Sequence, residues 1–106
     1  MKRYGFIFRI KPDLKGEFKK AHDNIWPELI KEIKEVGINN YTHFYREDGL
    51  IFAYFEANNP ESSLARLSEK EIRTKWEKTM EKYFIKKDNT KLGPETIVLE
   101  EIFHLD

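Results

Sequence analysis

Two hydrophobic periods alternate along this chain, and their order leaves few folds open. A period of two residues predicts strands over 3–10, 38–47, 50–57 and 96–105. Helical spacing predicts helices over 13–22, 27–36 and about 71–83, with a short helix that opens at Pro60. The order β-α-β-β-α-β predicts a ferredoxin-like α+β fold, in which helices cover one face of an antiparallel sheet. A length of 106 residues predicts one domain, residues 1–106.

Three short signals predict where these elements end. Gly37 follows the apolar stripe of the first helix, and glycine commonly terminates helices. Asp48-Gly49 stands between two predicted strands and is a favoured pair in tight hairpin turns. Ser68, with Glu71 three residues later, predicts a capping box at the start of the second main helix.

The predicted strands carry apolar residues on both of their faces. In the first strand Phe6 and Phe8 point one way and Ile7 the other, and the strand over 50–57 is apolar on both sides. An antiparallel sheet with one covered face should instead alternate apolar and polar residues. The second face therefore needs a cover, which is a second subunit, a ligand cavity or both. We infer a homodimer that pairs these sheets.

Composition excludes several classes of function. The chain has 19 Lys and Arg against 19 Asp and Glu, so it lacks the basic excess of a nucleic-acid binder or of a protein that docks on anionic membranes. It has no cysteine and only three scattered histidines, without a zinc motif or a phosphate-binding loop, so we expect no metal and no cofactor. No apolar run is long enough for a signal peptide or a membrane span, which predicts a cytoplasmic protein.

The string from His22 to Leu29 is the most unusual local feature. Asp23 and Asn24 favour helix ends, and Pro27 is tolerated only in the first turn of a helix. The first helix is therefore predicted to break here and restart. Such a break would turn the imidazole of His22 and the indole of Trp26 toward a shared concavity.

The same string resembles the signature of the L-rhamnose mutarotase family. The resemblance extends to Tyr41, to Trp76 and to the Asn-Tyr and Leu-Ile-Phe-Ala segments of the strands, and it covers nearly the whole chain. It implies a dimeric α/β barrel and an aldose 1-epimerase, which interconverts the α and β anomers of a pyranose by acid-base ring opening. The implied partner is a monosaccharide, L-rhamnose or a related sugar, and the implied chemistry uses neither cofactor nor metal.

The resemblance also assigns roles to three residues. On spacing alone, His22 is a partly exposed helix histidine, Tyr41 packs on a sheet and Trp76 packs in the core. The resemblance implies instead that His22 is the catalytic acid-base group, which suits a side chain whose pKa lies near neutrality. It implies that Tyr41 and Trp76 bind the sugar. His43 and His104 have no such support and are interpreted as structural or dimer-contact histidines.

Two positions depart from the pattern of the better-known family members. This chain has Phe18 where they carry a tyrosine, so one hydroxyl is lost, and Glu77 where they carry a second tryptophan. Glu77 is interpreted as facing solvent. These differences leave the physiological aldose open. Two other functions also remain open from the residues alone: a non-catalytic dimeric α/β-barrel module that binds a ligand, and a cofactor-free oxygenase on the same architecture.

Overall fold

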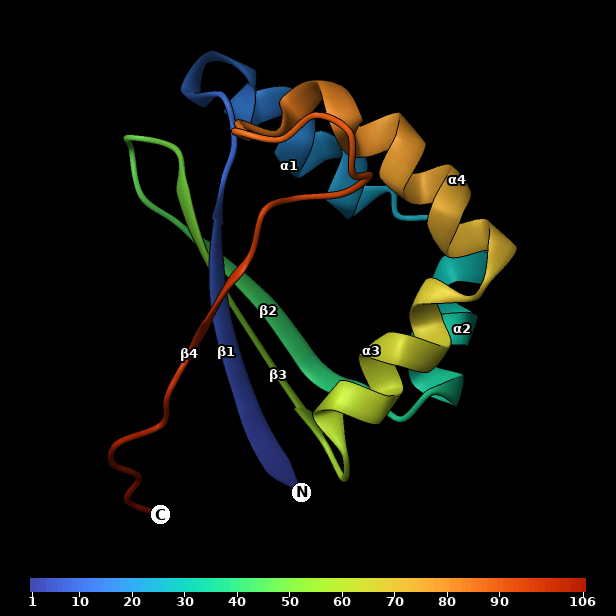
Figure 1. Cartoon of the computed structure of the whole chain (residues 1–106), viewed down its shortest axis with the longest axis vertical. Helices are drawn as coiled ribbons and strands as arrows, with labels where there is room; N and C mark the ends of the chain where they lie inside the picture. Colours follow the sequence, from blue (N-terminus) through green and yellow to red (C-terminus); the bar gives the residue numbers. More distant parts are fainter.

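The computed structural model describes residues 1–106 and has one sheet with all of its helices on one side (Figure 1). The strands are β1 (Lys2–Arg9), β2 (Asn39–Tyr45), β3 (Leu50–Ala57) and β4 (Ile97–Leu99). The α-helices are α1 (Lys15–Asp23), α2 (Pro27–Glu35), α3 (Pro60–Ser68) and α4 (Glu71–Met80), and short 3-10 helices cover Pro12–Leu14 and Glu81–Tyr83. The predicted ferredoxin-like α+β fold is therefore confirmed.

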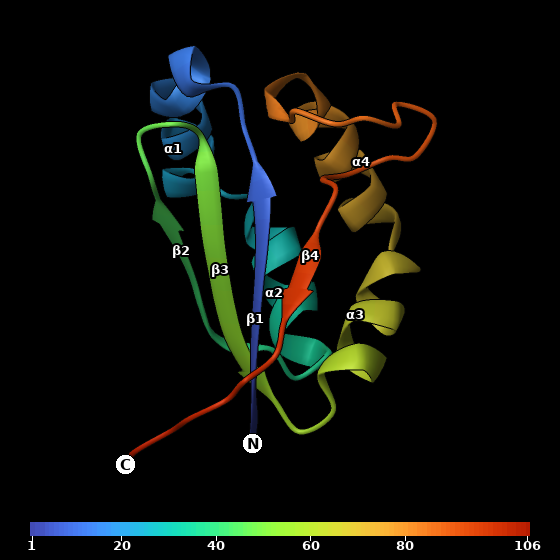
Figure 2. The ribbon, with the colours of Figure 1, turned by 60° about the vertical axis from the view of Figure 1, so that its left-hand side comes forward.

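The sheet is antiparallel, with the strand order β2-β3-β1-β4 (Figure 2). The central pair, β1 and β3, is in register along the whole of β1, from Lys2 opposite Ala57 to Arg9 opposite Leu50. The hairpin between β2 and β3 turns at Gly49, which has a φ of 96°, and Asp48 accepts two hydrogen bonds from Arg46. The hairpin predicted from Asp48-Gly49 is thus present.

A bulge in β2 decides which side chains face the helices. Asn39 pairs with Glu56 and Thr42 pairs with Tyr54, so β2 contains one residue more than β3 between these two pairs. Asn40 takes up the extra residue with a φ of 51°, a backbone conformation that asparagine adopts more readily than most residues. Bulges of this kind redirect side chains. Without it, Tyr41 would lie on the same face as Asn39; with it, Tyr41 points toward the helices.

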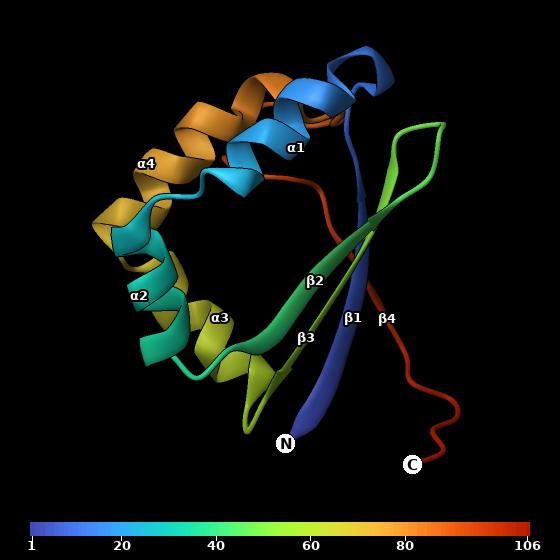
Figure 3. The same ribbon diagram turned by 180° about the vertical axis from the view of Figure 1, so that it is seen from behind.

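The predicted break between the first two helices is confirmed. Helix α1 ends at Asp23 and α2 begins at Pro27, with Trp26 in extended conformation between them. Helix α2 ends at Glu35, and Gly37 closes it in the double hydrogen-bond pattern of a Schellman motif, from Gly37 N to Lys34 O and from Ile38 N to Ile33 O. Both ends of α2 are therefore fixed by local sequence, and Figure 3 shows the two helices meeting at an angle beside β2.

Two predicted features are wrong. Ser68 does not begin a capping box: it is the last residue of α3, its hydroxyl donates to Ala65 O, and α4 starts after Lys70 without a side-chain cap. The last strand does not run over 96–105, because only Ile97–Leu99 pairs with β1. Beyond Leu99, Glu101 forms an ion pair with Arg3 on β1, and both side chains are exposed. Exposed ion pairs contribute only about 0.2–1 kcal/mol to stability.

The core lies between the sheet and the helices. Phe55 on β3, Ile10 after β1 and Leu29 on α2 have no exposed surface. Burying side chains of this size contributes roughly 1.5–3 kcal/mol each. The opposite face of the sheet stays open, since Phe44 is 60% exposed and stacks on Phe52, with ring centroids 6.2 Å apart. None of the helices has the length and apolar character needed to cross a bilayer.

Candidate active site

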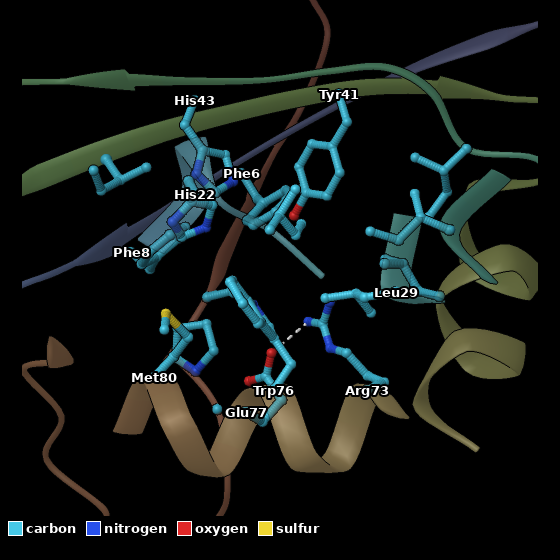
Figure 4. Close-up of a pocket in the computed structure, with 18 of the residues that line it drawn as sticks. Phe6, Phe8, His22, Leu29, Tyr41, His43, Arg73, Trp76, Glu77 and Met80 are labelled. Atoms are coloured by element: carbon cyan, nitrogen blue, oxygen red, sulfur yellow. Dashed lines mark ion pairs between the residues drawn. The ribbon is translucent and has the colours of Figure 1, made fainter. Parts of the chain in front are cut away.

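A cavity of about 1530 Å³ separates the inner face of the sheet from the helices. Aromatic and aliphatic side chains form most of its wall. Its polar side chains include His22 from α1, Tyr41 and His43 from β2, and Arg73 and Glu77 from α4. In Figure 4 the two labelled residues from β2 project toward the labelled residues of α4, with His22 between the layers. A largely apolar pocket with a few convergent polar groups is typical of small-molecule sites.

His22 occupies the last turn of α1, where the helix break leaves its ring beside the cavity. Its Nδ1 donates to the backbone carbonyl of Phe18 at 2.9 Å. Because a carbonyl can only accept, Nδ1 carries the proton and Nε2 is the nitrogen that gains or loses one. Burial lowers the pKa of His22, and the hydrogen bond to Phe18 partly opposes that shift. The ring is therefore fixed in orientation, and its pKa lies below the ordinary value for histidine.

Trp76 lies edge-on to His22, with ring centroids 5.4 Å apart, and is only 6% exposed. Trp26 packs edge-on against Trp76, with ring centroids 5.1 Å apart. His22 and Trp76 therefore lie side by side. The predicted concavity shared by His22 and Trp26 is absent, because Trp26 packs on Trp76 and does not line the cavity.

Tyr41 enters the same cavity because of the bulge at Asn40. Its ring packs edge-on against Phe55 at 5.5 Å and against His43 at 5.1 Å. Burial raises the pKa of Tyr41, so the phenol stays protonated and its hydroxyl can both donate and accept. No protein group hydrogen-bonds that hydroxyl. The three residues singled out from the sequence therefore line one cavity.

His43 is the main site residue that the sequence interpretation missed. Its ring packs against Phe8 and Phe18, as expected of a structural histidine, but it also faces the cavity, with its ring centroid 5.2 Å from that of His22. Burial, with the neighbouring His22, lowers the pKa of His43 to about 4. A signal was available, because His43 lies two residues after Tyr41 and a strand presents such residues on one face.

Glu77 also differs from its interpretation. Its side chain is only 12% exposed, and it forms an ion pair with Arg73 at 2.9 Å, one turn earlier on α4. The backbone of Gly93 packs against the carboxylate of Glu77 and covers it. Burial raises the pKa of Glu77, while Arg73 opposes that shift. The sequence spacing showed an i, i+4 pair, but such pairs usually lie on solvated helix faces.

The remaining titratable candidates lie elsewhere. His104 sits on the tail after β4, where it contacts Asp106 at 2.7 Å. No three His, Asp or Glu side chains are grouped so as to hold a metal ion. The chemistry that the cavity offers is therefore acid-base chemistry by imidazole, with hydrogen bonds from a phenol and an ion pair, and apolar contact from indole and phenyl rings. A pyranose has matching parts, namely a ring of hydroxyls and apolar C–H faces.

Comparisons with known proteins point to one family. A family model described as L-rhamnose mutarotase matches residues 3–105. Proteins named L-rhamnose mutarotase from Oceanobacillus iheyensis and Bacillus subtilis are 36% and 35% identical over 107 aligned positions, which cover all of this chain and all of each relative.

Solved structures show the same likeness. The crystal structure of L-rhamnose mutarotase from Formosa agariphila superposes with a TM-score of 0.84 at 29% identity, over 100% of both chains. A dimeric ferredoxin-like protein from an uncultured marine organism, only 13% identical, shares the fold with a TM-score of 0.63 over 98% of this chain and 96% of its own. The chain belongs to the L-rhamnose mutarotase family, whose members are isomerases that interconvert sugar anomers.

Proposed function

We propose that this protein interconverts the α and β anomers of L-rhamnose or a closely related pyranose, with His22 as the acid-base residue. The observation that carries the proposal is the geometry of His22. Its Nδ1 is held by the carbonyl of Phe18, which leaves Nε2 for a ligand in a cavity walled by Trp76. An imidazole with this pKa and this orientation suits a reaction that both donates and accepts protons.

Mutarotation opens the cyclic hemiacetal and closes it on the other face of the carbonyl. The ring oxygen must gain a proton as its bond to the anomeric carbon breaks, and the anomeric hydroxyl must lose one. His22 in its protonated form donates from Nε2 to the ring oxygen and takes that proton back on reclosure. One positioned acid or base typically accelerates such a step about 10²–10⁴-fold, which is adequate for a reaction that also occurs in water.

Tyr41 and Trp76 position the sugar in this proposal. The Tyr41 hydroxyl has no protein partner, so it is available to a sugar hydroxyl at no cost in internal hydrogen bonds. The indole of Trp76 presents an apolar surface against which the C–H face of a pyranose packs. A pocket for the 6-methyl group of L-rhamnose discriminates by only about 1–3 kcal/mol, so related sugars are expected to react as well.

The protein also forms a homodimer through the open face of its sheet in this proposal. Phe44 and Ile97, 60% and 62% exposed, stand on this face together with the ring of Phe52. Apolar side chains that cluster on an otherwise charged surface favour burial against another protein. The charges on the chain sum to zero, so repulsion between two identical copies is small.

Proton NMR on sugars at anomeric equilibrium tests the proposed activity. One anomeric proton signal of L-rhamnose is saturated, and transfer of saturation to the other anomer is measured with and without protein. We expect exchange with the wild-type protein, its loss in His22→Ala, and wild-type exchange in the matched control His104→Gln, which changes a histidine outside the cavity.

The outcome also separates the alternative functions. Sugar binding without exchange in the wild-type protein would identify a binding module. No binding and no exchange with L-rhamnose, fucose, lyxose or mannose would contradict a sugar-directed function and would reopen the oxygenase alternative, for which an aromatic substrate is the probe.

A further inference from the structure

Two imidazoles stand side by side in the cavity, and only one of them is used by the function proposed above. The ring of His43 lies 5.2 Å from that of His22, at an interplanar angle of 55°. Phe8 meets His43 edge-on at 5.7 Å, and Phe18 stacks on it at 6.3 Å and 17°. These rings fix the position of His43 without binding its nitrogens.

The nitrogens of His43 have no partner in the protein. No side chain or backbone group hydrogen-bonds either of them, although His22 next to it is held by a carbonyl. They are not sealed from solvent, because Glu32 Oε2 is the one fully buried side-chain polar atom that lacks a hydrogen-bond partner. His43 lines the cavity beside His22, so its free nitrogens are open to a ligand there.

We propose that His43 is the second acid-base residue of this site and works with His22 as a pair that shares one proton. The inference rests on the mutarotase function proposed above. Two oxygens bonded to the same carbon must exchange protons in opposite directions, and a single imidazole serves only one of them at a time. Two adjacent imidazoles of opposite protonation state serve both together.

The proton inventory of the step is balanced. Protonated His22 gives the proton on Nε2 to the ring oxygen, which keeps the electron pair of the breaking C–O bond. Neutral His43 takes the proton of the anomeric hydroxyl, whose O–H electrons form the carbonyl bond. The open-chain aldehyde now faces neutral His22 and protonated His43. After rotation about the bond next to the carbonyl, both transfers reverse, and the pair regains its starting state.

The surroundings favour a single proton on the pair. Two imidazolium ions at this separation repel each other, and burial disfavours both charges. The charged and titratable groups that face the rings are Asp23 on α1, Tyr41 on β2, and Arg73 with Glu77 on α4. Arg73 lowers the pKa of both histidines, and its pairing with Glu77 moderates that effect. His43, whose pKa is lowered to about 4, is the neutral member of the pair.

The pair predicts a bell-shaped dependence of kcat/KM on pH. The active form holds one proton, on His22. Activity falls as pH drops through about 4, because His43 then becomes protonated as well. Activity also falls as pH rises through the pKa of His22, which lies below its ordinary value. The acidic limb belongs to His43 and the alkaline limb to His22, as coupled macroscopic steps.

The test is the pH profile of anomeric exchange in His43→Gln, with His43→Phe as a second variant that keeps a flat ring against Phe18. We expect both variants to lower kcat about 10²-fold or more, with little change in KM, and to lose the acidic limb. His104→Gln is the matched control and should keep the wild-type profile.

Several results would overturn the inference. A wild-type acidic limb in His43→Gln, or an effect confined to KM, would show that His43 only shapes the cavity. If the variants fold poorly, the ring protons of the two histidines are titrated by NMR in the wild-type protein and in His22→Ala. The pKa of His43 should rise when its neighbour is removed, and an unchanged value would contradict a shared proton. Wild-type protein without exchange at any pH would overturn the proposed function and this inference together.

Discussion

The two faces of the sheet come from alternate residues of the same strands, yet they have opposite properties. On β2, Tyr41 and His43 turn inward to a cavity that also holds His22. Between and beside them, Thr42 and Phe44 turn outward to an open surface. The inner face combines buried rings with polar groups that lack protein partners, whereas the outer face carries exposed phenyl rings.

In the functions proposed above, neighbouring residues of one strand serve different purposes: those facing inward line the proposed active site and those facing outward form the proposed dimer surface. A strand assigns neighbouring residues to opposite faces, so a shift of one residue would exchange the two sets. The bulge at Asn40 produces such a one-residue shift within β2. As a result Asn39 and Thr42, although three residues apart, both face outward. Substitutions at matched positions on the two faces should therefore have unlike effects.

The largest contrast is expected between Phe55→Ala and Phe44→Ala. Phe55 has no exposed surface and stacks on Tyr4 at 4.9 Å, so its truncation should lower the free energy of unfolding by about 3–5 kcal/mol. Phe44 is 60% exposed, and its truncation should cost little within one subunit. Urea unfolding at several protein concentrations measures both, since any dimer contribution depends on concentration. Equal losses would contradict the assignment of inner and outer faces.

The pH dependence of stability is the next largest effect. The pKa of His43 is lowered to about 4, so between pH 4 and 6.5 the unfolded chain binds more protons than the folded one. Stability is therefore fully present above about pH 6.5 and falls as pH drops through this window, by up to about 2–3 kcal/mol for this residue. His43→Phe should flatten that part of the curve in urea titrations. A variant curve parallel to the wild-type curve would place His43 in solvent.

A charge on the outer face should disrupt the proposed dimer. Phe44→Lys puts an unpaired cation beside its own copy or among apolar side chains, and should weaken association by about 2 kcal/mol or more. Sedimentation of the wild-type and variant proteins measures the change. The matched variant is Thr42→Lys, which changes the residue two positions earlier on the same face of β2. It shows whether the dimer buries that part of the face as well. A wild-type monomer at micromolar concentration would contradict the proposed interface.

The smallest effect is expected at the bulge. Asn40→Ala keeps a β-carbon at a φ of 51° and should cost about 1–2 kcal/mol, whereas Asn40→Gly should be better tolerated because glycine adopts this conformation freely. Both variants lose the hydrogen bond from Asn40 to Glu56, so their difference isolates the backbone term. Thermal unfolding of the two variants gives that difference. An alanine variant as stable as the glycine variant would show that the bulge is not strained.

Much of the fold was predictable because periodicity and local signals agreed. Pro27 and Gly37 marked the two ends of α2, and Asp48-Gly49 marked the hairpin, each through backbone geometry that depends on few neighbours. The capping box at Ser68 failed because α3 continued through that residue, which local sequence does not settle. The last strand was too long in the prediction because the apolar pattern of the tail does not say whether a partner strand is present.

The site was predictable in part for a related reason. The resemblance picked out His22, Tyr41 and Trp76, and the structure places all three around one cavity. His43 and Glu77 were missed because their roles depend on which helix face and which strand face turn inward, and on how Gly93 closes over α4. Those are tertiary facts. Only the shared face of Tyr41 and His43 was open to inference from the sequence.

The most direct test of this account is to locate bound sugar on the protein. L-rhamnose is titrated into protein with labelled histidine, tryptophan and phenylalanine rings, and NMR shift changes are followed at both faces of the sheet. The account predicts changes at His22, His43 and the indole of Trp76, with the rings of Phe44 and Phe52 unaffected. Shift changes confined to Phe44 and Phe52, with the cavity residues silent, would contradict it.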